Sequence, residues 1–140
     1  MEQRLSLITL GVADVARSRR FYEALGWRAS GASQDDVSFF QAGGMALALW
    51  GRTELTRDAG VPDGSGFGGV ALAYNARSRA EVDDVLGQAR TAGAHILRPA
   101  RDTFYGGYAG YFADPDGHPW EVAWNPHFLL DAGGNLRLPD

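Results

Sequence analysis

A repeated order of apolar segments most restricts what this 140-residue chain can fold into. Residues 5–50 follow the pattern of a strand, a helix and three further strands, and residues 68–124 follow that pattern again. One such unit alone leaves a sheet face uncovered, whereas two units can place their helices outside and enclose a cleft. We therefore predict an α+β fold, with two tandem βαβββ modules forming a curved mixed sheet around a cleft.

The predicted elements divide a single domain, 1–140, into two modules. Module one covers about residues 5–50 and module two about residues 68–126. Asp14 and Ser78 are expected to cap the two helices, because short polar side chains accept hydrogen bonds from the free N–H groups of a first helical turn. The expected strands are 5–12, 27–31, 36–42 and 45–50 in module one, and 68–75, 94–97, 108–113 and 119–124 in module two.

Three segments lack a clear strand or helix pattern. Residues 51–66 are polar and rich in Gly, Pro and Asp, so they are expected to be a linker or flexible loop. Residues 99–107 are expected to be a loop as well. The tail, 127–140, carries consecutive apolar residues at 128–130, and we expect it to dock on the body of the protein or on a partner subunit.

Composition excludes several classes of function. The net charge is −4 and the basic residues are scattered, so no nucleic-acid partner is expected. The chain has no cysteine, which removes disulfides, thiolate nucleophiles and cysteine-bound zinc. No apolar run approaches the roughly 20 residues that span a bilayer, and no apolar leader is apparent. We expect a cytoplasmic protein without a membrane partner.

The hairpin at 108–124 contains the most informative local motif. Asp114-Pro115-Asp116-Gly117 is typical of a tight turn, since Pro presets φ and Gly accepts a positive φ. In the strand that follows, Glu121 is a lone carboxylate among aromatic and aliphatic residues. A carboxylate in that setting is a ligand, an acid/base group, or a strand residue that points to water.

Two motifs together resemble the vicinal oxygen chelate superfamily, which includes glyoxalase I, bleomycin-resistance proteins and extradiol dioxygenases. One is the stretch 11–27, with Asp14, Phe21-Tyr22 and Leu25-Gly26; the other is Asp114-Pro115-Asp116-Gly117-His118 followed by Glu121. The resemblance covers about residues 5–126. It implies the paired-module fold and a homodimer, but not one reaction, because the family's chemistries differ.

Family enzymes hold a divalent metal with residues from four strands, and the resemblance places these positions on Leu7, Leu47, Gly69 and Glu121. Only Glu121 can ligate a metal, whereas such sites need at least three N or O ligands. We therefore expect neither a metal bound in the family manner nor another cofactor.

Strand alternation predicts which side chains line the cleft. Residues that share the face of Glu121 are expected inside it, and the opposite set, which includes Phe40 and Trp50, is expected under the helices. Tyr105 flanks the cleft from its loop and Trp120 lies at its edge. The predicted ligand-binding residues are Thr9, Phe39, Leu47, Gly69, Tyr105, Tyr111, Trp120 and Glu121.

Three functions remain open from the sequence. The first is a protein that binds or sequesters a small, partly aromatic molecule, similar to bleomycin-resistance proteins. The second is an enzyme of lyase, isomerase or dioxygenase type, in which Glu121 serves as catalytic base or metal ligand. The third is an interaction domain that holds no ligand.

Overall fold

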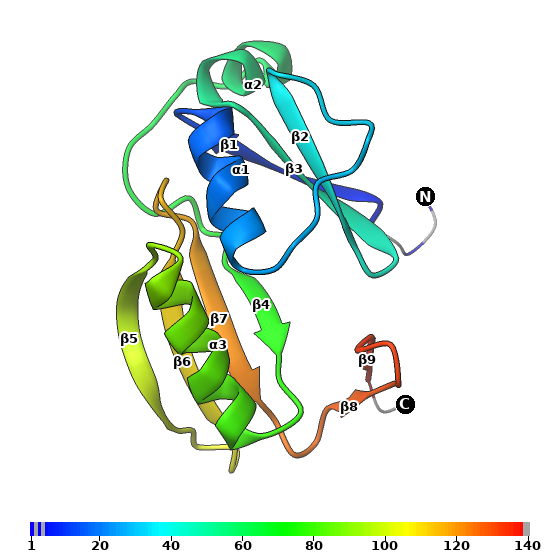
Figure 1. Ribbon diagram of the computed structural model, residues 1–140, viewed down its shortest axis with the longest axis vertical. Helices are drawn as coiled ribbons and strands as arrows, with labels where there is room; N and C mark the ends of the chain where they lie inside the picture. Colours follow the sequence, from blue (N-terminus) through cyan, green and yellow to red (C-terminus); the bar gives the residue numbers. More distant parts are fainter. Residues whose placement is uncertain (2, 4, 139–140) are drawn as a thin grey trace. The chain divides into compact units, whose positions relative to one another are not determined.

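The computed structural model describes residues 1, 3 and 5–138. The chain forms two compact units, Met1–Gly68 and Gly69–Asp140, and each is described by itself. Both combine a sheet with helices, which confirms the predicted α+β class (Figure 1). No helix in the described ranges is long and apolar enough to cross a membrane.

Unit 1 contains a three-stranded sheet of β1 (Leu7–Val12), β2 (Val37–Ala42) and β3 (Met45–Gly51). The strand order is β1-β3-β2, with β1 parallel and β2 antiparallel to β3. The strand predicted at 27–31 is wrong, since its only pairing is a single bridge between Ala29 and Phe40. Unit 1 therefore has one strand fewer than the predicted module.

Helix α1 (Val15–Ala24) covers one face of that sheet. Asp14 caps it as predicted, because its carboxylate accepts a 2.9 Å hydrogen bond from the Arg17 N–H. The rings of Tyr22 and Phe40 lie 5.8 Å apart, and both side chains are almost fully buried. These contacts place the core of unit 1 between α1 and the sheet face that carries Phe40.

Helix α2 (Arg52–Ala59) occupies half of the segment 51–66 that was predicted to be a linker or flexible loop, so the prediction is wrong for that half. Gly60 ends the helix in the left-handed conformation that favours glycine, with φ at 68°. A Cβ atom on Gly11 would lie 3.3 Å from Leu55 Cδ2, so Leu55 packs against β1. The Leu55 side chain thus attaches α2, which is otherwise mainly polar, to the sheet.

Unit 2 contains a four-stranded sheet in the order β4-β7-β6-β5, shown in Figure 1. The hairpin strands β6 (Tyr108–Ala113) and β7 (Pro119–Trp124) have the predicted bounds. Strand β4 (Leu72–Asn75) begins later than predicted. Strand β5 (His95–Asp102) runs into the predicted loop at 99–107, so the loop is shorter than expected.

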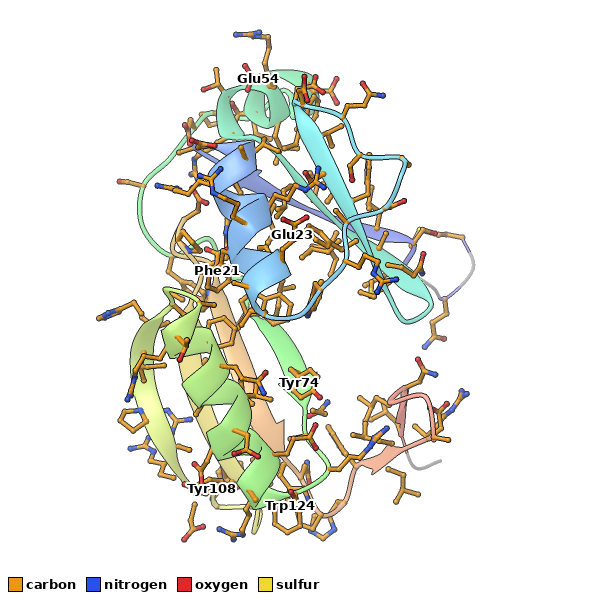
Figure 2. All side chains as sticks on the ribbon, in the orientation of Figure 1. Phe21, Glu23, Glu54, Tyr74, Tyr108 and Trp124 are labelled. Carbon is orange, nitrogen blue, oxygen red and sulfur yellow. The ribbon has the colours of Figure 1, made fainter. Side chains whose placement is uncertain are left out.

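Helix α3 (Arg79–Thr91) packs on one face of this sheet. Ser78 caps it as predicted, accepting a 3.1 Å hydrogen bond from the Glu81 N–H. A Cβ atom on Gly110 would lie only 2.6 Å from Leu86 Cδ1, so α3 sits directly against β6. At the start of the helix, the Arg79 guanidinium stacks on the rings of Tyr108 and Trp124, 5.3 Å from each centroid. Figure 2 shows Tyr108 and Trp124 at the same end of unit 2.

The tail forms a small hairpin of β8 (Leu129–Leu130) and β9 (Leu136–Arg137). The Arg77 guanidinium donates to the backbone carbonyls of Asp131 and Ala132, at 3.4 and 3.2 Å. The tail is therefore tied to the loop before α3 in the same unit.

Candidate functional site

Glu121 lies on the face of the unit 2 sheet that α3 does not cover. Its neighbours across the ladder are Tyr111 on β6 and Ala73 on β4, and directly opposed residues share a sheet face. Gly110 and Val122, which pair on the opposite face, pack toward α3. Glu121 is half-buried.

The Tyr111 hydroxyl is held beside the Glu121 carboxylate. Burial raises the pKa of Tyr111 above its ordinary value of 10.0, and a hydrogen bond to Glu121 raises it further. Tyr111 therefore keeps its proton at neutral pH and donates it toward the carboxylate. The pair can accept a hydrogen bond from a bound molecule through the remaining lone pairs of Glu121.

Arg98 on β5 covers the other side of Tyr111. Its guanidinium carbon lies 5.1 Å from the centroid of the Tyr111 ring, which is cation–π distance. Its Nη1 atom is buried and, among the residues that the structure describes, has no hydrogen-bond partner. A buried donor without a protein partner is unfavourable unless it is hydrogen-bonded, so this N–H group can donate to an acceptor in the pocket.

An open pocket of about 460 Å³ connects these groups. That volume lies within the usual range of roughly 300–1,000 Å³ for small-molecule sites. Phe104 at its rim is fully exposed, and its ring meets that of Tyr105 edge-on at 5.3 Å between centroids. The lining residues are Arg98, Arg101, Asp102, Thr103, Phe104, Tyr105 and Glu121.

The short loop that carries the aromatic pair has internal hydrogen bonds. The Thr103 N–H donates to the Gly107 carbonyl at 3.0 Å, and the Gly107 N–H donates to the Thr103 hydroxyl at 3.0 Å. A Cβ atom on Gly107 would lie 2.5 Å from the Trp124 carbonyl oxygen, so only glycine fits there. These contacts hold Phe104 and Tyr105 at the pocket.

In unit 2, Tyr105 and Glu121 line the pocket and Tyr111 lies beside Glu121, whereas Trp120 and Gly69 are not part of the lining. Trp120 pairs with Phe112 on the α3 face, where the two rings stack 6.0 Å apart, so its expected place at the edge of the cleft needs correction. Gly69 precedes β4 and has a φ of 78°, outside any strand. Its expected strand position is also corrected.

In unit 1, Thr9 and Phe39 both pair with Ala48 and share the face turned away from α1. Leu47 lies on the opposite face, where it pairs with Phe40 and is buried. Leu47 was expected to share a sheet face with Thr9 and Phe39, and this expectation is wrong, because the next residue, Ala48, lies on that face. Trp50, expected under the helix, lies on the Thr9 face instead.

Sequence reasoning missed Arg98 and Arg101, which line the pocket. The segment 99–107 was predicted to be a loop, whereas β5 extends through it to Asp102. Pro99 was the available signal, because proline inside a strand pattern marks an edge strand or a bulge. Strand β5 is an edge strand, and its pairing with β6 is irregular on both sides of Arg98.

Glu121 is a potential metal ligand on the open sheet face of unit 2. Its neighbours on that face, Ala73 and Tyr111, offer no carboxylate or imidazole. His118 is engaged by Asp114, whose carboxylate lies 2.8 Å from His118 Nδ1. In the described part of the chain no group of three or more His, Asp or Glu side chains could hold a metal ion.

The chain belongs to the glyoxalase/bleomycin resistance protein/dioxygenase superfamily, whose sequence pattern matches residues 4–122. The search of curated proteins gave no match. Among solved structures, a glyoxalase-related enzyme from Fulvimarina pelagi is 39% identical, with a TM-score of 0.91. That similarity covers 99% of this chain and 100% of the other.

Two further structures share the fold at lower identity. A glyoxalase/bleomycin resistance protein/dioxygenase from Nocardioides is 24% identical, with a TM-score of 0.72, and the match covers 99% of this chain and 91% of that one. A family enzyme from Burkholderia phytofirmans is 19% identical, with a TM-score of 0.76, over 85% and 96% of the two chains.

Proposed function

We propose that the protein binds a small, partly aromatic molecule in the pocket beside Glu121, without a metal bound in the family manner. The observation that carries the proposal is the pocket itself. It combines an exposed ring, Phe104, and a half-buried one, Tyr105, with the half-buried carboxylate of Glu121. Aromatic surface beside convergent polar groups that fix orientation is a usual feature of a ligand site.

Binding is tested by calorimetric titration with a panel of aromatic natural products and antibiotics. Phe104→Ala removes the exposed ring and is expected to weaken binding, because aromatic contacts supply most of the apolar area. The stability of the fold should change by less than about 0.5 kcal/mol, as for other exposed sites. Phe67→Ala is the matched control, since Phe67 is also exposed and does not line the pocket.

A second candidate function is an enzyme that uses Glu121 as a general base. The supporting observation is the carboxylate placed between the Tyr111 hydroxyl and the pocket, where it can take a proton from a bound carbon acid. The Fulvimarina pelagi relative, described as a glyoxalase-related enzyme, favours the same reading.

This second function is tested with the hemithioacetal of methylglyoxal and glutathione as substrate. Glu121→Gln should lower turnover by about 10²–10⁴-fold, the usual contribution of a general base, while binding is retained. If neither the wild type nor the Glu121→Gln variant turns over this substrate, ligand binding is left as the function. Failure of both turnover and binding would favour an interaction domain without a ligand.

We also infer a homodimer, which the family resemblance implies. Sedimentation equilibrium measures the mass directly, and the chain alone is 15.1 kDa. A single species at the mass of one chain over a wide concentration range would contradict a dimer.

A further inference from the structure

Strand β5 places two guanidinium groups on the pocket side of its sheet. Arg98 pairs with Tyr111 and Arg101 pairs with Ala109, two positions on the face of Glu121. Residues three apart on a regular strand point to opposite faces. Both arginines face the pocket only because the β5–β6 register shifts between them. A bulge that re-aims a side chain is a common feature beside a binding site.

These two arginines differ from others in the chain because no carboxylate neutralises them. Several arginines form ion pairs, namely Arg19, Arg52, Arg79 and Arg137. In the part of the chain that the structure describes, neither Arg98 nor Arg101 has an acidic side chain at ion-pair distance. Asp102 also lines the pocket, but its carboxylate pairs with Arg79.

The charge that is not neutralised by an ion pair is therefore positive on the β5 side of the pocket. Glu121, the other carboxylate of the lining, lies on β7 opposite Tyr111 and is separated from β5 by strand β6. Arg98 also keeps a buried Nη1 without a partner among the described residues. A guanidinium presents a rigid planar set of donors that matches an oxyanion with two oxygens.

We propose that the ligand of this pocket is an aromatic molecule bearing an oxyanion, a carboxylate or a phosphate ester, held by Arg98 and Arg101. This inference rests on the proposed binding function. The anion lies at the β5 side of the pocket, and the aromatic body lies against Phe104 and Tyr105. A hydrogen-bond donor on the ligand faces Glu121, which keeps the anion away from that carboxylate.

The test compares three probes of one shape by calorimetry: 2-naphthoate, 2-naphthyl phosphate and the neutral 2-naphthamide. Both anions are expected to bind at least about tenfold more tightly than the amide, since charge-assisted hydrogen bonds are the stronger class. The relative affinity of naphthoate and naphthyl phosphate then shows which oxyanion the site prefers.

Substitutions locate the effect on the two arginines. Arg98→Gln and Arg101→Gln should each lower anion affinity by about tenfold or more and leave amide binding within about twofold. Arg98→Lys keeps the charge without the planar fork and should lie between wild type and Arg98→Gln. Arg90→Gln removes one positive charge from α3, outside the pocket lining, and should change neither affinity.

The outcomes separate this inference from the proposed function. Equal affinity for the anions and the amide, unchanged in Arg98→Gln and Arg101→Gln, would overturn the anion site while pocket binding stands. An equal loss in Arg90→Gln would reduce the effect to net charge and would overturn the site as well. Absence of binding by all three probes at millimolar concentration would overturn the binding function together with the anion site.

Discussion

In unit 1 the sheet face turned away from α1 carries Thr9, Phe39 and Ala48, whereas the corresponding face of unit 2 carries Tyr111, Glu121 and the two β5 arginines. Both units cover the other face of the sheet with a helix that begins at a polar cap. The arrangement of a sheet with one face covered by a helix is thus repeated in the two units, whereas the charged groups on the other face are not. Strand β5, which has only a single-bridge counterpart in unit 1, supplies the cations.

In this duplicated fold, the groups that stabilise each unit are separate from the groups available for chemistry. In each unit the helix-covered face provides apolar burial, which holds the strands in register. The open face is then free to differ between units, and only in unit 2 does it carry a carboxylate beside a tyrosine hydroxyl.

Phe40→Ala should lower the free energy of unfolding by about 3–5 kcal/mol, because it removes an almost fully buried ring from the α1 face. Phe39→Ala, the adjacent residue on the open face, should cost clearly less. Chemical denaturation followed by circular dichroism measures both. A cost for Phe39→Ala as large as that for Phe40→Ala would show that the open face of unit 1 is packed like a core.

Gly110→Ala should destabilise the protein by about 1–3 kcal/mol through overpacking. The added Cβ would lie 2.6 Å from Leu86 Cδ1 and 2.9 Å from the Ala100 nitrogen, and the latter backbone atom cannot easily move. Gly11→Ala is the counterpart in unit 1, where the nearest atoms lie at 3.3 Å and the cost should be smaller. A reversed order in thermal unfolding would contradict the direct packing of α3 on β6.

Asp14→Ala and Ser78→Ala should each cost about 1 kcal/mol, because each removes the acceptor that caps a helix. Equal costs would show that the two units depend on their caps to the same degree. Ser65→Ala in the exposed segment before Gly66 is a control without a helix to cap. Denaturation curves indistinguishable from this control would contradict a stabilising role for the caps.

Tyr111→Phe should have the smallest effect, and it is a pH effect. The folded-state pKa of Tyr111 is raised above 10.0, so its contribution to stability is complete below that pH and is lost as pH rises through the folded pKa. The variant should lose less stability in this alkaline range than the wild type. Tyrosine ionisation followed by ultraviolet absorbance should show one late-titrating group fewer, and an unchanged curve would contradict the buried position.

Much of the scaffold follows from local sequence signals. Asp14 and Ser78 mark helix starts and Asp114 marks a turn, because each of these three side chains accepts a hydrogen bond from a nearby backbone N–H. The bounds of β6 and β7 follow from that turn and from the aromatic and β-branched residues on either side. The proximity of Glu121 to Tyr111 follows in turn from the hairpin register.

The predictions from the sequence are wrong where the alternation of apolar and polar residues carries no information or is interrupted. Residues 45–50 are apolar at every position, so the sequence does not mark which side of β3 faces the helix, and Leu47 was placed on the wrong face. The register shifts of β5 are set by pairing with β6, and the sequence hides them apart from Pro99. Helix α2 depends on the contact of Leu55 with β1, which local polarity does not reveal.

Strand β5 has one further consequence, for association between molecules. It lies at an edge of its sheet, where unpaired backbone groups can recruit a strand from another chain. Pro99 offers no N–H group, and the shifted register twists the backbone on either side of Arg98. The irregular pairing that turns two arginines toward the pocket therefore also makes this edge a poor partner for a strand of another chain. The protein should resist sheet-to-sheet aggregation there at high concentration.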